Sequence, residues 1–129
     1  GENNPDAIFV FKFAGAFTVA ASAKIILTNG ARACNIFWIG GAGVATGAVS
    51  LGAAAVLKGT FLSHGGACSS GAGVFLEGRQ LSTAGAVNTY SGAVYNNPVC
   101  ITSTISNTLV PIFCSAVKKT LRVPLKPAK

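Results

Sequence analysis

The chain has 129 residues, of which half are apolar and only 10% are charged, whereas an average soluble domain has roughly 25% charged residues. This length allows no more than one domain. The net charge of +7 comes largely from the five basic residues that follow position 117, so the rest of the chain is nearly neutral. Because that part lacks a basic surface interleaved with aromatic residues, nucleic-acid binding is not expected.

A repeated pattern runs along the chain from the first apolar stretch to residue 90. Each copy opens with a short segment: DAIFVF at 6–11, CNIFWI at 34–39, GTFLSH at 59–64 and GRQLST at 78–83. A corner of Gly and Ala follows each of these. After each corner comes a second segment: FTVA at 17–20, GVAT at 43–46, CSSG at 68–71 and VNTY at 87–90. A third segment closes three of the units, at 25–28, 56–59 and 75–78.

Self-similarity at about 19 to 28 residues predicts a solenoid. The segments are short, are rich in β-branched and aromatic residues, and lack helical periodicity, so they are expected to be strands. Three short strands per turn predict an all-β fold, a parallel β-helix of roughly triangular section with about four coils. The solenoid is expected over residues 1–97. Residues 98–129 would add one or two strands and an extended basic tail that contains proline.

Two columns of large apolar residues are expected to fill the interior. One column consists of Phe9, Phe37, Leu62 and Leu81, and the other of Leu27, Leu57 and Leu76. Parallel coils lie about 4.8 Å apart, so equivalent residues in successive coils touch. The same alignment makes Lys58 and Glu77 outward neighbours and predicts an ion pair between them, although an exposed pair contributes less than about 1 kcal/mol.

The uncharged stretch from 33 to 57 contains a G-x-x-x-G at Gly43 and Gly47, which is a pattern of membrane helices. This stretch has too few large apolar residues for insertion, and it aligns with parts of the chain that cannot be membrane helices. A membrane span is therefore not expected. The basic tail is expected to be solvated, with contact to an acidic polymer or a membrane surface as the alternative.

The four cysteines, Cys34, Cys68, Cys100 and Cys114, permit disulfides and are compatible with an exported protein. Their spacing does not select a pairing, although Cys100 with Cys114 would close the shortest loop. The chain contains no C-x-x-C and a single histidine, so no metal site is expected. Nothing in the sequence indicates a cofactor.

An enzyme is not expected either. The chain has only three carboxylates, and a paired general acid and base would have to use Glu77 with a residue near the terminus. His64 is the sole imidazole and lies beside a Gly-Gly corner, where a surface turn is its ordinary role. No nucleophile with a base and an orienting group can be assembled.

Four stretches, in order, resemble the microbial ice-binding proteins: PDAIFVFK at 5–12, NGARACNIFW at 29–38, LKGT at 57–60 and LEGRQLSTAGAV at 76–87. The resemblance covers about residues 4 to 97. It implies a right-handed β-solenoid flanked by one long helix, and a secreted, non-enzymatic protein that binds ice. The family domain is longer, and this chain corresponds to its C-terminal half. We therefore expect a fragment or processed product, without the opening coils, cap and helix.

The resemblance also implies a binding face that is flat and built from Thr, Ser and Ala. The segment after each corner is the candidate, with alternate residues pointing outward. The expected outward set is Ala16, Thr18, Ala20, Ala42, Val44, Thr46, Ala67, Ser69, Ala86 and Asn88. An error of one residue in the register would exchange the inward and outward sets. The alternative is that this face packs against another element or subunit.

Two functions therefore remain open. The first is ice binding by an extracellular protein, with ice or ordered water as the partner. The second is a structural subunit of an extracellular fibre or matrix, whose partners are copies of itself. Low charge and uncapped strand edges favour the second function, because an uncapped solenoid end is a template for pairing. The C-terminal segment would then bridge neighbouring subunits.

Overall fold

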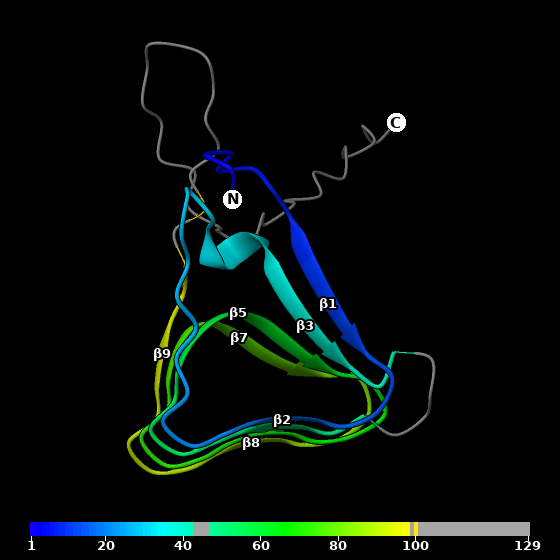
Figure 1. Ribbon diagram of the computed structural model, residues 1–129. Helices are drawn as coiled ribbons and strands as arrows, with labels where there is room; N and C mark the ends of the chain where they lie inside the picture. The colour runs from blue at the N-terminus through cyan, green and yellow to red at the C-terminus, as the bar shows by residue number, and fades with distance from the viewer. Residues whose placement is uncertain (43–46, 99, 101–129) are drawn as a thin grey trace, which may run out of the picture. The chain divides into compact units, whose positions relative to one another are not determined.

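The computed structural model describes residues 1–42, 47–98 and 100. The chain divides into two units, Gly1–Val99 and Cys100–Lys129. All the described residues except Cys100 belong to the first unit, which is a right-handed parallel β-solenoid (Figure 1). The expected fold class is therefore confirmed.

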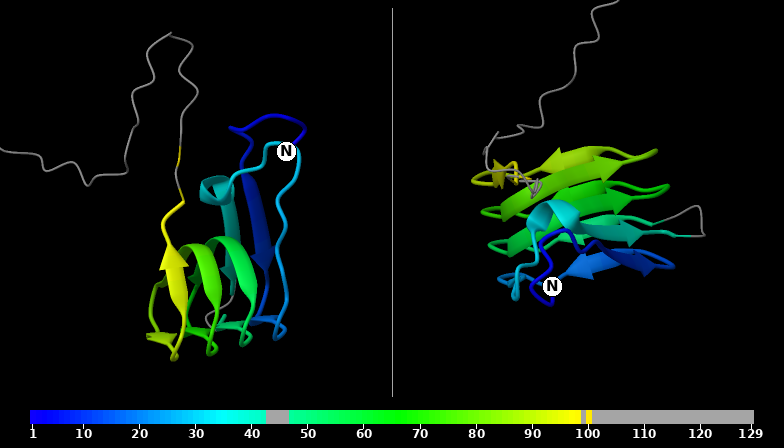
Figure 2. Two further views of the ribbon diagram at one scale, coloured as in Figure 1. Left: turned by 90° about the vertical axis from the view of Figure 1, so that its left-hand side faces the viewer. Right: turned by 90° about the horizontal axis from the view of Figure 1, so that it is seen from above.

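Two parallel sheets form the walls of the solenoid. The larger sheet has the order β1-β3-β5-β7-β9, with strands Phe9–Phe13, Ile36–Gly40, Val56–Ser63, Phe75–Ser82 and Val94–Asn96. The smaller sheet has the order β2-β4-β6-β8, with strands Phe17–Val19, Val49–Leu51, Cys68–Ser70 and Val87–Thr89. Each coil contributes one strand to the smaller sheet, which gives four coils stacked along the axis (Figure 2). A single 3-10 turn, η1 (Ala33–Asn35), precedes β3 in the described residues.

The coils are triangular in outline, and the long strands β5 and β7 each cover two of the three sides (Figure 1). Both strands bend at a glycine, and the two glycines, Gly59 and Gly78, pair with each other in the ladder. Their φ angles are +106° and +156°, which L-residues with a side chain rarely adopt. The expected third strand of these coils is therefore the first part of β5 and of β7, not a separate element.

Gly78→Ala is expected to destabilise the solenoid by about 1–3 kcal/mol, because a Cβ at this φ is strained and would overlap the carbonyl oxygen of Gly59. Urea unfolding followed by circular dichroism measures the change. Gly73→Ala is the control, because Gly73 also has a positive φ but its Cβ would make only an ordinary van der Waals contact, 4.0 Å from the Cα of Ala54. Equal losses in the two variants would contradict a role for the close contact between the bends.

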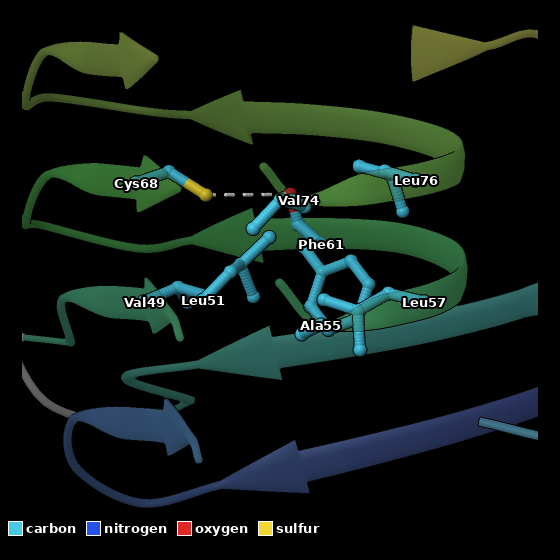
Figure 3. Close-up of a cluster of buried hydrophobic side chains, with 8 residues drawn as sticks. All are labelled: Val49, Leu51, Ala55, Leu57, Phe61, Cys68, Val74 and Leu76. Atoms are coloured by element: carbon cyan, nitrogen blue, oxygen red, sulfur yellow. Dashed lines mark hydrogen bonds between the residues drawn. The ribbon is translucent and has the colours of Figure 1, made fainter. Parts of the chain in front are cut away.

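The core is a cluster of fully buried side chains from both sheets, with Phe61, Leu57 and Leu76 the largest (Figure 3). An aromatic stack extends this cluster along the axis, since Phe11 pairs with Trp38 and Trp38 pairs with Phe61. The ring centroids of Phe11 and Trp38 lie 4.3 Å apart, and those of Trp38 and Phe61 lie 5.8 Å apart. The indole Nε1 of Trp38 donates to the carbonyl oxygen of Lys58, so this partly buried ring leaves its one polar atom paired.

The interior column expected at Phe9, Phe37, Leu62 and Leu81 is wrong. Phe37 pairs with Thr60. Leu62 pairs with Leu81, but Leu62 alternates with the fully buried Phe61, so both leucines point away from the interior. The true interior column continues from Phe61 to Gln80.

The first coil is also shifted. Phe9 pairs with the buried Ile36, one residue before the partner expected for it. In the leucine column, Leu57 pairs with Leu76 and both are fully buried. Leu27 is not their neighbour: the bridge between Lys24 and Val56 places Ile25 beside Leu57. Ile25 packs against the core instead.

Candidate functional site

The three outer faces of the solenoid differ in charge. The face of β1, β3, β5 and β7 carries Lys12 and the exposed Arg79. The third side carries Lys24 and the ion pair between the Lys58 ammonium and the Glu77 carboxylate. The face of β2, β4, β6 and β8 carries no charged residue in these strands. Its water contacts are therefore made by neutral side chains alone.

A column of small polar residues runs along the middle of this uncharged face. Thr18 pairs with Ser50, Ser50 with Ser69, and Ser69 with Asn88. Each lies between two residues that point into the solenoid, so the column points outward. Successive members are therefore about 4.8 Å apart, the spacing of neighbouring strands. We call these four residues the polar column.

Alanines, glycines and one tyrosine, Tyr90, flank the polar column. On one side the residues that precede the strands are all alanine: Ala16, Ala48, Ala67 and Ala86. Backbone hydrogen bonds of 2.9 Å hold them in register, from Phe17 N to Ala48 O, Val49 N to Ala67 O and Cys68 N to Ala86 O. On the other side the residues that follow the strands are Ala20, Gly52, Gly71 and Tyr90. The polar column and the alanine column together are named the small-residue face.

The second coil differs from the expectation. Its strand on this face is Val49–Leu51, so the segment expected at 43–46 is not that strand. Ala42 lies in the turn after β3, where its N–H donates to Phe13 O, whereas Val44 and Thr46 lie outside the described residues. Ala48 and Ser50 take the places expected for Ala42 and Val44.

Sequence reasoning missed these two residues because the corner before β4 is longer than the others. Eight residues separate β3 from β4, against four between β5 and β6. The signal that identifies the strand is the alternation A-V-S-L at 48–51, which matches A-F-T-V at 16–19. An alignment anchored on the Gly-Ala corner places the strand six residues too early, at 43 instead of 49.

The side chains beneath the small-residue face are held tightly. Val49, Leu51 and Cys68 point from their strands into the core (Figure 3). Burial raises the pKa of the Cys68 thiol, and its Sγ lies 3.9 Å from the carbonyl oxygen of Phe61. Cys34 and Cys68 both carry free thiols, so no disulfide joins them. Cys114 lies outside the described residues, so the expected disulfides that would involve it are not tested.

Cys68 is expected to resist alkylation in the folded protein, because it is fully buried and its raised pKa keeps the thiol protonated. Cys34 is only partly buried and should react first. Because the folded-state pKa of Cys68 is raised, its contribution to stability is fully present below the ordinary thiol pKa. That contribution is lost as the pH rises from the ordinary pKa through the raised one. Iodoacetamide labelling followed by peptide mass spectrometry measures both rates; equal rates in the native state would contradict the buried position.

The remaining polar groups form no catalytic set in the described part of the chain. His64 Nδ1 lies 3.3 Å from Thr83 Oγ1 at an exposed corner, and the Glu77 carboxylate is engaged by Lys58. No group of three metal-ligating side chains occurs among the described residues. Within those same residues, no helix has the length and hydropathy needed to cross a membrane.

These features define a class of protein: a right-handed parallel β-solenoid with one sheet whose strands carry no charged residue. The sequence matches the ice-binding-like family over residues 1–94, and the chain belongs to that family. This match confirms the resemblance that the four sequence stretches indicate. No curated protein matches the chain.

Solved structures agree with this assignment. An ice-binding protein from an Antarctic bacterium of the Flavobacteriaceae is 38% identical, with a TM-score of 0.70 over 85% of this chain and 25% of that one. An ice-binding protein from an Antarctic biological consortium is 33% identical, with a TM-score of 0.65 over 74% of this chain and 40% of that one. The DUF3494 domain of a Shewanella frigidimarina ice-binding protein is 26% identical, with a TM-score of 0.63 over 74% of this chain and 38% of that one. The chain thus spans less than half the length of these relatives.

Proposed function

We propose that this chain binds ice through the small-residue face. The observation that carries the proposal is the polar column: four neutral side chains stand in register on the one outer face whose strands carry no charge. Membership of the ice-binding-like family and the similarity to ice-binding proteins of known structure support it.

Water hydrates a neutral face differently from a charged one. A charged side chain orders water around itself in an arrangement that ice does not share, whereas methyl and hydroxyl groups can order water into an ice-like lattice. Parallel pairing repeats Thr18, Ser50 and Ser69 at the strand spacing. The backbone ladder holds these groups before binding, so little conformational entropy is lost when ordered water or ice meets the face.

The proposal is tested on the purified chain by measuring thermal hysteresis, which is the gap between the melting and freezing temperatures, together with inhibition of ice recrystallisation. Both activities should be present and should rise with protein concentration. A folded chain that shows neither activity at high concentration would exclude ice binding. Lysozyme at the same molar concentration serves as a control for colligative effects.

We further propose that the protein acts outside the cell and has no catalytic role. The family assignment supports both statements. The described carboxylates provide no pair for acid–base chemistry, since Glu77 is bound to Lys58 while Glu2 and Asp6 lie in the N-terminal turns. Ice outside the cell would be the partner that such a surface meets.

Self-assembly remains a second candidate, and one observation favours it. Strand β1 is the edge of its sheet, and the ring of Phe11 at that edge is 42% exposed although it begins the interior aromatic stack. Such an edge can accept another strand, and a copy of this chain could supply it. Sedimentation velocity over a range of concentrations tests this candidate: assembly should give larger species as the concentration rises, and a monomer throughout would exclude it.

A further inference from the structure

The corner at which the chain enters the small-residue face is built on a serine. Ser63 and Ser82 end strands β5 and β7, pair with each other, and point into the solenoid, where Ser63 is fully buried. Gly66 follows Ser63 and Gly85 follows Ser82 in their corners, and Gly47 occupies the same place in the preceding coil. Each of these glycines comes directly before an alanine of the small-residue face. The serines thus lie beside the points where β4, β6 and β8 begin.

A chain of hydrogen bonds connects these corners across three coils. Ser63 Oγ lies 2.7 Å from Gly47 O and 2.6 Å from Gly66 O, and its single proton is shared between these two acceptors. Ser82 Oγ donates to Gly66 O at 2.7 Å. The same Ser82 oxygen accepts from Gly85 N at 2.9 Å. The carbonyl oxygen of Gly66 therefore accepts from two serines in successive coils, Ser63 of the third coil and Ser82 of the fourth.

The corners are also packed without space between them. A Cβ added to Gly66 would lie 2.7 Å from Ala48 N, and one added to Gly85 would lie 2.5 Å from Ala67 N, both closer than real Cβ atoms approach. Each corner therefore rests directly on the alanine of the preceding coil. A shift of one glycine carbonyl has to move the alanine that follows it.

We propose that Ser63 and Ser82 are positioning residues for ice contact: their hydroxyls fix where β6 and β8 enter the small-residue face and so keep its columns in one plane. This inference rests on the proposed function. Loss of the Ser82 hydroxyl removes a donor from Gly66 O and the acceptor of Gly85 N. Among the described residues β8 is the edge strand of its sheet, so no further strand of that part of the chain holds Ala86 and Asn88 in place.

The test compares three variants for thermal hysteresis and for melting temperature. Ser82→Ala should lose more hysteresis than Val74→Ala, which removes buried volume from the core just before β7 and changes neither a residue of the small-residue face nor a hydrogen bond of the serine corners. Ser82→Thr keeps the hydroxyl and should retain the activity. For each variant, the loss of hysteresis is divided by the loss of melting temperature. If this ratio is the same for Ser82→Ala and Val74→Ala, the serine has only a structural role and the inference fails.

Amide hydrogen exchange separates this inference from the proposed function, because it needs no ice. Cys68 N donates to Ala86 O on the small-residue face, and Val94 N donates to Val74 O on the third side. In Ser82→Ala, exchange at Cys68 should rise roughly fivefold while Val94 stays unchanged. Unchanged exchange at Cys68 overturns the positioning role. A second outcome is increased exchange at Cys68 in a protein whose unsubstituted form shows no hysteresis. This result would support the positioning of β8 by Ser82, but it would overturn both the link to ice contact and the proposed function.

Discussion

Ser69→Tyr is expected to abolish most of the thermal hysteresis while leaving the fold intact. Ser69 stands in the middle of the polar column, with Ser50 and Asn88 on either side. A phenol ring at this point would project beyond Ala67 and Gly71, which flank it in its own coil, and would hold an ice surface away from the middle of the polar column. Because the side chain points outward, the free energy of unfolding should change by no more than about 0.5 kcal/mol.

Asn96→Tyr is the matched control for this variant. Asn96 is an exposed strand residue of the fourth coil, but it lies on the third side, beside Glu77. It should keep full activity if ice meets only the small-residue face. Activity lost equally in both variants would contradict the choice of face, and activity lost only in Asn96→Tyr would assign ice binding to the third side. Circular dichroism melts on both variants exclude unfolding as the cause.

The third and fourth coils are predictable from the sequence because nothing is inserted between them. Their strands β5 and β7 pair over their full length without a bulge. In VLKGTFLS and FLEGRQLS the bend glycines fall at the same position, and the side chains before them are Lys58 and Glu77. The glycine is diagnostic here because the bend requires a φ that few other residues adopt. The segments after the two glycines have the same length, so the same register continues through the rest of both strands.

The first two coils could not be aligned from residue types alone. The turn at Asn29 and Gly30 and the 3-10 turn before β3 lengthen the first coil, and the long corner before β4 lengthens the second. Apolar residues occur on both faces of β1 and β3, so a pairing slipped by one residue still matches apolar with apolar. Alternation distinguishes the two faces only where one of them is polar.

The same limit applies to the small-residue face. Thr18, Ser69 and Asn88 follow from alternation because their neighbours on the strand are apolar or point inward. Ser50 cannot be placed by alternation, because the residues between β3 and β4 have the same kinds of side chains as a strand of this sheet. What distinguishes the true strand is the hydrogen-bond ladder, in which Val49 N donates to Ala67 O. Such pairing is a property of the stacked coils and is invisible in one coil alone.

Phe61→Ala is expected to destabilise the solenoid by about 3–5 kcal/mol, the usual cost of removing a buried phenyl ring. Phe61 is fully buried and its ring stacks on Trp38 and Phe17, with centroids 5.8 and 6.3 Å apart. The cavity would lie between the two sheets, where the backbone ladders prevent collapse. A loss of this size is a large share of the stability of a small domain, about 5–15 kcal/mol, so the urea concentration at the unfolding midpoint should fall markedly. Urea titration followed by tryptophan fluorescence and far-UV circular dichroism measures the change.

Leu62→Ala is the matched control, because it changes the next residue of the same strand. Leu62 points to the outer face and pairs there with Leu81, which is 44% exposed. Its truncation removes little buried surface and should cost only about 1 kcal/mol. The two variants together therefore decide the register of β5: a larger loss for Leu62→Ala than for Phe61→Ala would reverse the inward and outward sets of that strand. A reversal would also turn Lys58 inward, where an ammonium group is costly to bury, so the ion pair with Glu77 favours the register described here.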